Sequence, residues 1–117
     1  MNSEVVDPTA LKEVLGINDK AVLAGFYIDF LHTGAATIDE IQRAFDVQQG
    51  GEVGRLAHRL KSSARTIGAN DLADCCLALE EAGRSGDLQS ITLHMSKLPL
   101  YFSRVGQWIE QHVKSEK

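Results

Sequence analysis

Apolar residues recur along this chain with the spacing of helices, and no stretch alternates convincingly as a β-strand does. The longest stripe runs through Leu23, Phe26, Tyr27, Phe30, Ile38, Ile41 and Phe45. At about 100° per residue these positions stay on one face. A single phase over that distance predicts one long helix over residues 19–47.

Capping residues and turn residues mark the other helices. Asp7-Pro8 predicts a short first helix over 8–15, which Gly16 ends, and Asn18 caps the long second helix. After the turn at 48–51, the third helix is expected over 52–67, ending at Gly68. Asn70 caps a fourth helix over 71–84.

The last helix is expected over 88–114, after the stop and new cap in the segment 83–87. Its stripe contains Leu88, Ile91, Met95 and Leu98, then Tyr101, Phe102, Val105, Trp108, Ile109 and Val113. Pro99 is expected to kink or split this helix, because proline removes a backbone donor and clashes with the preceding turn.

Amphipathic helices joined by short turns bury their stripes best as an antiparallel bundle. The predicted fold class is therefore all-α, an antiparallel up-down four-helix bundle with a short extra N-terminal helix that caps one end. The length of 117 residues fits a single domain over 1–117.

Composition places the chain among soluble globular proteins, with 44% apolar and 24% charged residues and a net charge of −4. An acidic chain is not expected to bind nucleic acid. No signal peptide follows Met1, and the apolar stretch at 21–31 is interrupted by Asp29 and looks too short to span a bilayer. We expect a cytoplasmic protein without a membrane partner, and nothing demands a dimer, so we expect a monomer.

The two cysteines, Cys75 and Cys76, are adjacent and have no metal-binding spacing. They are expected to be small core residues in a reducing compartment. A di-iron bundle needs Glu-x-x-His pairs, and the sequence contains none. No metal and no cofactor are therefore predicted for this chain.

The third helix places one histidine opposite its core stripe. Its apolar positions cluster within about 80° of arc: Val53, Leu56, Ala57, Leu60, Ala64 and Ile67. His58 lies about 160° from the centre of that stripe, so it is expected to face solvent.

The helical neighbours of His58 are small or basic. Gly54 and Ser62 lie one turn to either side, with Arg55, Lys61 and Arg65 on the same outer face. An exposed imidazole is often neutral and nucleophilic near pH 7, and the basic side chains favour a dianionic group on it. The helix alone leaves a second interpretation open, a solvated face with a chance histidine.

The stretch His58-Arg59-Leu60-Lys61-Ser62-Ser63-Ala64-Arg65-Thr66-Ile67-Gly68-Ala69 resembles the signature of the histidine phosphotransfer (HPt) family. That signature has a histidine, a lysine three residues on, a small residue four on and a glycine ten on, which His58, Lys61 and Gly68 match. The residues that follow also resemble the family: Leu72, Cys76, Leu79-Glu80 and Arg84-Ser85-Gly86-Asp87. The chain departs from the pattern at Ser62, where the family often has glycine.

The resemblance implies a phosphorelay carrier. His58 would accept a phosphoryl group from an aspartate of a receiver domain, with Lys61 supplying a cation, and pass it to a second receiver. The partners would be the receiver domains of a hybrid sensor kinase and of a response regulator, and Mg²⁺ would be brought by the receiver. The chain has no ATP-binding motif, so it would be no kinase. The alternative is an HPt-like module that binds or sequesters a receiver without accepting phosphate.

The family also places polar groups from the next helix beside the histidine, at the positions of Glu80 and Arg84. Glu80 would orient the ring, and Arg84 would help neutralise the phosphate. The alternative is an exposed pair at a helix end.

A second apolar group, Ala24, Ile28, Leu31 and Ala35, lies off the stripe of the second helix. With Gly54 and Arg55 it forms a candidate docking surface for a receiver beside His58, as the resemblance implies. The alternative is that Leu11, Leu15 and the first helix cover it. His32, His94 and His112 have no comparable setting and are expected to be structural or solvated.

Overall fold

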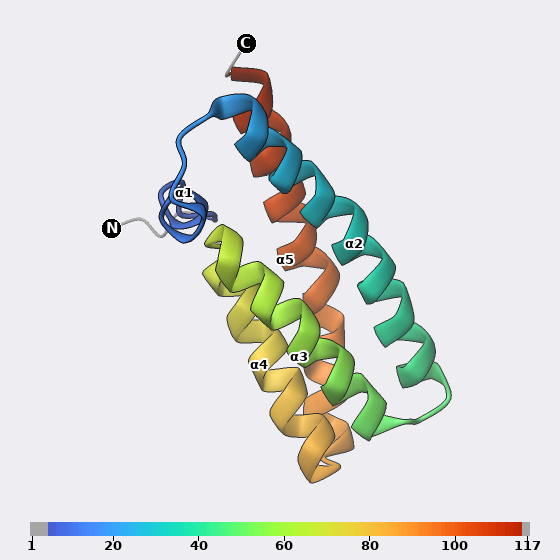
Figure 1. The fold of residues 1–117 in the computed structure, drawn as a ribbon. Coiled ribbons are helices and arrows are strands. Elements are labelled where there is room, and N and C mark those ends of the chain that lie inside the picture. Colours follow the sequence, from blue (N-terminus) through green and yellow to red (C-terminus); the bar gives the residue numbers. More distant parts are fainter. Residues whose placement is uncertain (1–4, 116–117) are drawn as a thin grey trace.

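The computed structural model describes residues 5–115, and these form five helices without a strand. The helices are α1 (Ala10–Leu15), α2 (Lys20–Asp46), α3 (Gly50–Ile67), α4 (Asn70–Ser85) and α5 (Leu88–Ser115). Helices α2 to α5 run up and down as an antiparallel bundle, and α1 lies across one end of it, near the end of α3 (Figure 1). The predicted all-α bundle is confirmed.

The core is built from the helix stripes. Each of α2, α3, α4 and α5 contributes fully buried large side chains, such as Ile41, Leu56, Leu79 and Leu98. Burying aliphatic side chains of this size stabilises the fold by about 1.5–3 kcal/mol each. Helix α3 is the central element, because it packs against three helices, α1, α2 and α4.

The first helix begins later than predicted. Asp7 does not cap it: its carboxylate accepts hydrogen bonds from the backbone and hydroxyl of Thr9, which makes a tight turn before Ala10. Such local bonds of aspartate compete with helix formation. The cap of α2 is Asp19, whose side chain accepts from the backbone of Val22, and not Asn18.

Helix α4 runs past the expected stop. Gly83 lies inside it, and Gly86 is the left-handed residue that ends it. Asn70 is the first residue of α4 rather than its cap, and α3 begins at Gly50, two residues earlier than predicted.

Helix α5 continues through Pro99, so of the kink or split expected there, the split does not occur. Pro99 is exposed. Its ring therefore crowds the solvent side of the preceding turn, and the core face on either side of it, at Leu98 and Val105, stays continuous.

Two residues of the predicted stripes are not in the core. Phe26 is 45% exposed and Leu88 is 59% exposed. A side chain at Gly34 would meet Leu60, so α2 and α3 are level there. Since the two helices are antiparallel, residue 26 lies level with the end of α3, and α3 does not cover it.

Helix α2 is long and apolar enough to cross a membrane, by length and composition alone. From the sequence, only residues 21–31 were considered, and this property of α2 was therefore not predicted. The same test is passed by core helices of soluble proteins. Here one face of α2 is packed into the bundle through Tyr27, Phe30 and Ile41.

Three glycines bring the backbones of α3 and α4 together. A Cβ atom on Gly83 would lie 2.5 Å from the carbonyl oxygen of Gly50 and 2.9 Å from the nitrogen of Gly54. Both distances are shorter than real Cβ contacts, so only glycine fits at position 83. This close approach sets the spacing between His58 on α3 and the side chains of α4.

Candidate functional site

His58 stands on the outer side of α3, as its helical angle predicts. Its side chain is 57% exposed. The buried face of α3 lies opposite, through Leu56, Ala57 and Leu60. The imidazole is thus accessible to a partner while its backbone is held by the core.

Glu80 holds the ring of His58 from the neighbouring helix. Its Oε2 atom lies 2.9 Å from Nδ1 of His58. A carboxylate is an acceptor, so this contact places a proton on Nδ1 and leaves the lone pair of the neutral ring on Nε2. Within the described residues, Nε2 has no hydrogen-bond partner.

Lys61 is held by the same carboxylate. Its ammonium donates to Oε1 of Glu80 at 2.6 Å, and its side chain is only 12% exposed. Lys61 therefore does not reach over the imidazole in this structure. It anchors Glu80, which in turn orients His58.

Arg84 completes the cluster from one turn further along α4. Its guanidinium donates to Oε2 of Glu80 at 2.9 Å, and its side chain is 72% exposed. Glu80 and Arg84 thus form part of one network with His58 and are not a solvated pair at a helix end. The exposed guanidinium lies where it is able to meet an anion brought to His58.

Glu80 remains ionised although it is buried. The hydrogen bond from Lys61 lowers the pKa of this carboxyl, burial raises it, and the contact with His58 lowers it again, with a net shift downward. A permanent negative charge therefore lies beside Nδ1. This charge stabilises the positive charge that a group added at Nε2 would create on the ring.

An open hollow surrounds the imidazole. It is lined by Gly51, Gly54, Arg55, His58, Arg59, Glu80 and Arg84. Three of these residues are arginines, in a chain whose net charge is −4. The hollow thus presents three guanidinium groups, each also in contact with a carboxylate, beside one nucleophile.

Ser62 and Arg65 do not join this network. The Ser62 hydroxyl donates to the carbonyl of His58 at 3.3 Å, within its own helix. Arg65 is exposed, and seven residues along a helix correspond to about 10 Å from His58. The structure brings neither side chain to the ring.

Gly68 has a structural role rather than a chemical one. It ends α3 with φ of 84°, in the left-handed region that favours glycine. A Cβ atom there would lie 2.7 Å from the carbonyl oxygen of Asp7. Gly68 therefore connects α3 to the N-terminal segment and is not part of the site.

The small size of Gly54 serves helix packing more than partner access. Gly54 is buried, and a Cβ atom on it would lie 3.1 Å from the carbonyl oxygen of Glu80. Arg55 is exposed on the outer side and pairs with Glu52. Of these two predicted docking residues, only Arg55 presents its side chain to a partner.

The predicted docking patch does not lie beside His58. Leu31 faces Gly106 of α5, and Ala24 lines a pocket with His112 and Val113 of α5. Ile28 and Ala35 share that side of α2 by helical angle. The patch follows the α5 edge of α2. Helix α1 does not pack over it, since its main contact is with α3.

The edge of α2 that borders α3 is polar, and sequence reasoning missed it. Arg59 approaches Glu40 across the two helices at 4.0 Å. The only signal in the sequence was opposite charge on two outer faces, and that does not show which helices are neighbours. The packing role of Gly83 was also missed, because a glycine near a helix end predicts the end of that helix.

The remaining histidines lie elsewhere. His32 is exposed, and His94 is half-buried near Cys75. His112 stacks on Trp108 with ring centroids 4.4 Å apart. None of them shares the basic hollow of His58.

Comparison with known proteins assigns the chain to a family. The profile described as "Hpt domain" matches residues 25–108, which is more than half of the chain. The chain belongs to the Hpt domain family. It is accordingly a histidine phosphotransfer module of phosphorelay signalling.

Individual relatives agree with this assignment. The Hpt domain is 29% identical over 101 residues to the virulence sensor protein BvgS of Bordetella bronchiseptica and to that of Bordetella parapertussis. The match covers 80% of the chain but only 8% of the length of these relatives. The fold matches the crystal structure of histidine-containing phosphotransfer protein B (HptB) from Pseudomonas aeruginosa PAO1. That match has a TM-score of 0.86 at 20% identity and covers 97% of this chain and 98% of that one.

Proposed function

We propose that His58 is the phosphorylated residue of this Hpt domain. The observation that carries the proposal is the exposed imidazole whose Nδ1 is held by Glu80, which leaves Nε2 directed away from the carboxylate. The family supplies the chemistry, and this geometry favours His58 over the other three histidines.

The reaction runs by displacement at phosphorus. The lone pair of Nε2 attacks the phosphoryl group of an aspartyl phosphate on a receiver domain. The N–P bond forms as the bond between phosphorus and the aspartyl oxygen breaks, and the aspartate leaves as a carboxylate. The proton stays on Nδ1, so the phosphorylated ring carries a positive charge that Glu80 stabilises.

Of the cations around the hollow, Arg84 is the one that we infer to act on the phosphoryl oxygens. The transition state is loose and spreads charge over three oxygens, so positioning and charge stabilisation supply most of the catalysis. Arg84 is able to leave Glu80 and meet an oxygen, because its side chain is exposed. Lys61 is a positioning residue, since it is engaged by Glu80.

The partners we propose are the receiver domains of a hybrid sensor kinase and of a response regulator, one donating and one accepting the phosphoryl group. Mg²⁺ would be carried by the receiver. The carboxylate nearest to His58 is already satisfied by Lys61 and Arg84, which supports this division. The chain would act as a carrier and not as a kinase.

We also propose that the chain works in the cytoplasm, as a monomer. Two free buried cysteines support a reducing compartment. Sedimentation or light scattering of the purified chain tests the second statement, and a dimer at micromolar concentration would contradict it.

The test is phosphoryl transfer from a receiver domain labelled with a small phosphodonor. The chain should acquire acid-labile, base-stable label, and His58→Gln should acquire none. His32→Gln and His94→Gln are matched controls that should accept label normally. Incubation with Mg-ATP alone should give no label. If His58→Gln still binds the receiver and the natural chain takes no label from any receiver, the chain is a binding module instead.

A further inference from the structure

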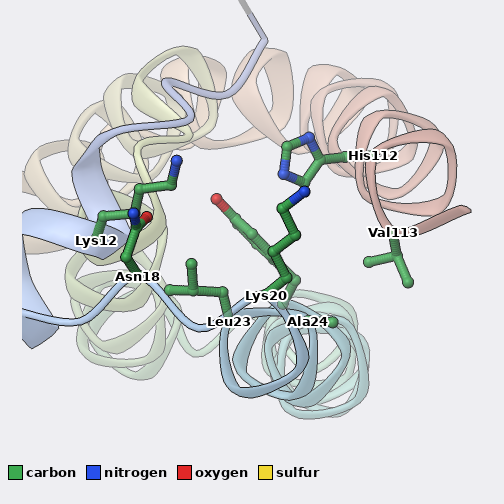
Figure 2. Close-up of a pocket in the computed structure, with 8 residues that line it drawn as sticks. Lys12, Asn18, Lys20, Leu23, Ala24, His112 and Val113 are labelled. Carbon is green, nitrogen blue, oxygen red and sulfur yellow. The ribbon is translucent and has the colours of Figure 1, made fainter. Parts of the chain in front are cut away.

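A second site lies at the other end of the bundle and shares no residue with the hollow around His58. A cavity of about 160 Å³ is lined by Lys12, Asn18, Lys20, Leu23, Ala24, Tyr27, His112 and Val113. A cavity of roughly 150 Å³ admits a molecule the size of benzene. Figure 2 shows Lys12 and Asn18 on one side of the space and Lys20 and His112 on the other.

The deciding residue is Tyr27, which is 2% exposed. Its hydroxyl makes no hydrogen bond with any described residue. Among those residues, no fully buried polar side-chain atom lacks a partner. The small exposed part of Tyr27 is therefore its hydroxyl, which opens into the cavity without a partner. The hydroxyl is thus a donor, on an otherwise buried ring, that a ligand in the cavity is able to reach and to hydrogen-bond.

The ring of Tyr27 is fixed in place. It makes edge contacts with Trp108 at 5.5 Å and with His112 at 5.6 Å between ring centroids. Burial, and to a smaller extent the charge of Asp7, raises the pKa of Tyr27. The hydroxyl therefore stays protonated at neutral pH and is available as a donor.

The lining is cationic and apolar but not acidic. Lys12 is exposed, and its ammonium forms no ion pair with a described residue, whereas Lys20 and His112 take part in interactions of their own. Leu23, Ala24 and Val113 form the apolar wall. The acidic group whose charge reaches Tyr27 is Asp7, and its carboxylate is engaged by Thr9.

We propose that this cavity binds a small carboxylate attached to an apolar group. The carboxylate lies between the ammonium of Lys12 and the hydroxyl of Tyr27. The apolar part lies against Leu23, Ala24 and Val113. This activity is independent of phosphoryl transfer at His58.

The test is a titration of the full ¹⁵N-labelled chain with sodium benzoate, followed by NMR. Benzamide has the same shape without the charge and is the control ligand. Benzoate should give saturable shifts of the amides of Ala24, Tyr27 and Val113, and benzamide should not. Tyr27→Phe and Lys12→Gln should each weaken binding by roughly tenfold, since each removes a hydrogen bond to a charged group.

Lys114→Gln is the matched control, because Lys114 is an exposed lysine of the same end of α5 that does not line the cavity. It should bind benzoate normally, and so should His58→Gln. Lys12→Gln changes an exposed side chain and keeps the test valid should Tyr27→Phe fail to fold. Equal shifts with benzamide, or unchanged affinity in both Tyr27→Phe and Lys12→Gln, would overturn the proposal.

Discussion

Glu80 interacts with three side chains at once, and its negative charge has a different effect on each. It orients His58, neutralises the nearly buried ammonium of Lys61 and pairs with the exposed Arg84. Removing the charge while keeping the shape therefore has two separable effects, one on folding and one on transfer.

Glu80→Gln should lower the free energy of unfolding by about 1–3 kcal/mol, because Lys61 loses its anionic partner in a largely buried position. It should also slow phosphoryl acceptance by His58. Urea unfolding and transfer assays measure the two effects. Arg84→Gln is the control for stability: an exposed ion pair contributes about 0–1 kcal/mol. A Glu80→Gln chain as stable as the natural one would contradict the assigned role.

The stability that the charge of Glu80 contributes should depend on pH in a defined direction. The folded-state pKa of Glu80 is depressed below its ordinary value of 4.5. A depressed carboxyl contributes stability that is present above the unfolded-state pKa and is lost as the pH falls through the folded-state value. The difference in unfolding free energy between the natural chain and Glu80→Gln should thus be largest near neutral pH and shrink below pH 4.5.

Burial also changes the chemistry of two individual residues, Cys75 and Cys76. Burial raises the pKa of Cys75 to about 11 and that of Cys76 to about 12. The thiolate is the reactive form, so both thiols should resist a maleimide at pH 8 in the folded chain and react once urea unfolds it. Rapid labelling of the folded chain would show that α4 opens locally.

At the scale of elements, the contact between α3 and α4 decides the geometry of the site. Gly83→Ala would place a methyl group against the backbone of Gly50 and Gly54, which have no flexible end to move aside. We expect a loss of about 2 kcal/mol or more and slower transfer, since Glu80 moves away from His58. Thermal unfolding and the transfer assay measure both.

Gly25→Ala is the matched control for that change. Gly25 lies inside α2 with open space around its Cβ position, so alanine should raise stability by about 0.5–1 kcal/mol through helix propensity. A destabilisation of similar size in both variants would show that the glycines of α3 and α4 have no special role.

The existence of the helices was predictable from the sequence because their apolar stripes are local patterns. Their contacts were not. The stripe of α2 does not show that α3 ends level with Phe26, or that Ala24 and Leu31 lie on the α5 edge. The position of His58 was predictable from helical angle alone, and the family motif singled out Glu80. That Lys61 bonds to Glu80 and not to the phosphoryl position depends on the spacing of two helices, which no local pattern encodes.

At the scale of the whole molecule, an acidic chain presents a basic hollow to its partner. Three arginines line that hollow: Arg55, Arg59 and Arg84. The proposed receiver partner is expected to bring an acidic pocket, and the two surfaces would then be complementary. Complementary charge acts mainly on the rate of association and weakens with salt.

Arg59→Glu should therefore reduce the rate of phosphoryl transfer from a receiver at low salt and flatten its dependence on salt concentration. Because the changed residue does not touch the ring of His58, the maximal rate at saturating receiver should change little. Arg104→Glu is the matched control, since Arg104 is an exposed arginine of α5 beside Tyr101. An equal effect of both variants would assign the change to net charge.

The glycine contact between α3 and α4 has a further consequence for the proposed carrier, which would serve two partners in turn. Backbones packed at this distance leave little freedom for rearrangement, so we expect the surface around His58 to change little when a receiver binds. Little ordering entropy is then lost on association. Each receiver would bind the same preformed surface. The rates of association and dissociation would then limit the exchange of receivers, and no conformational change of the carrier would be needed.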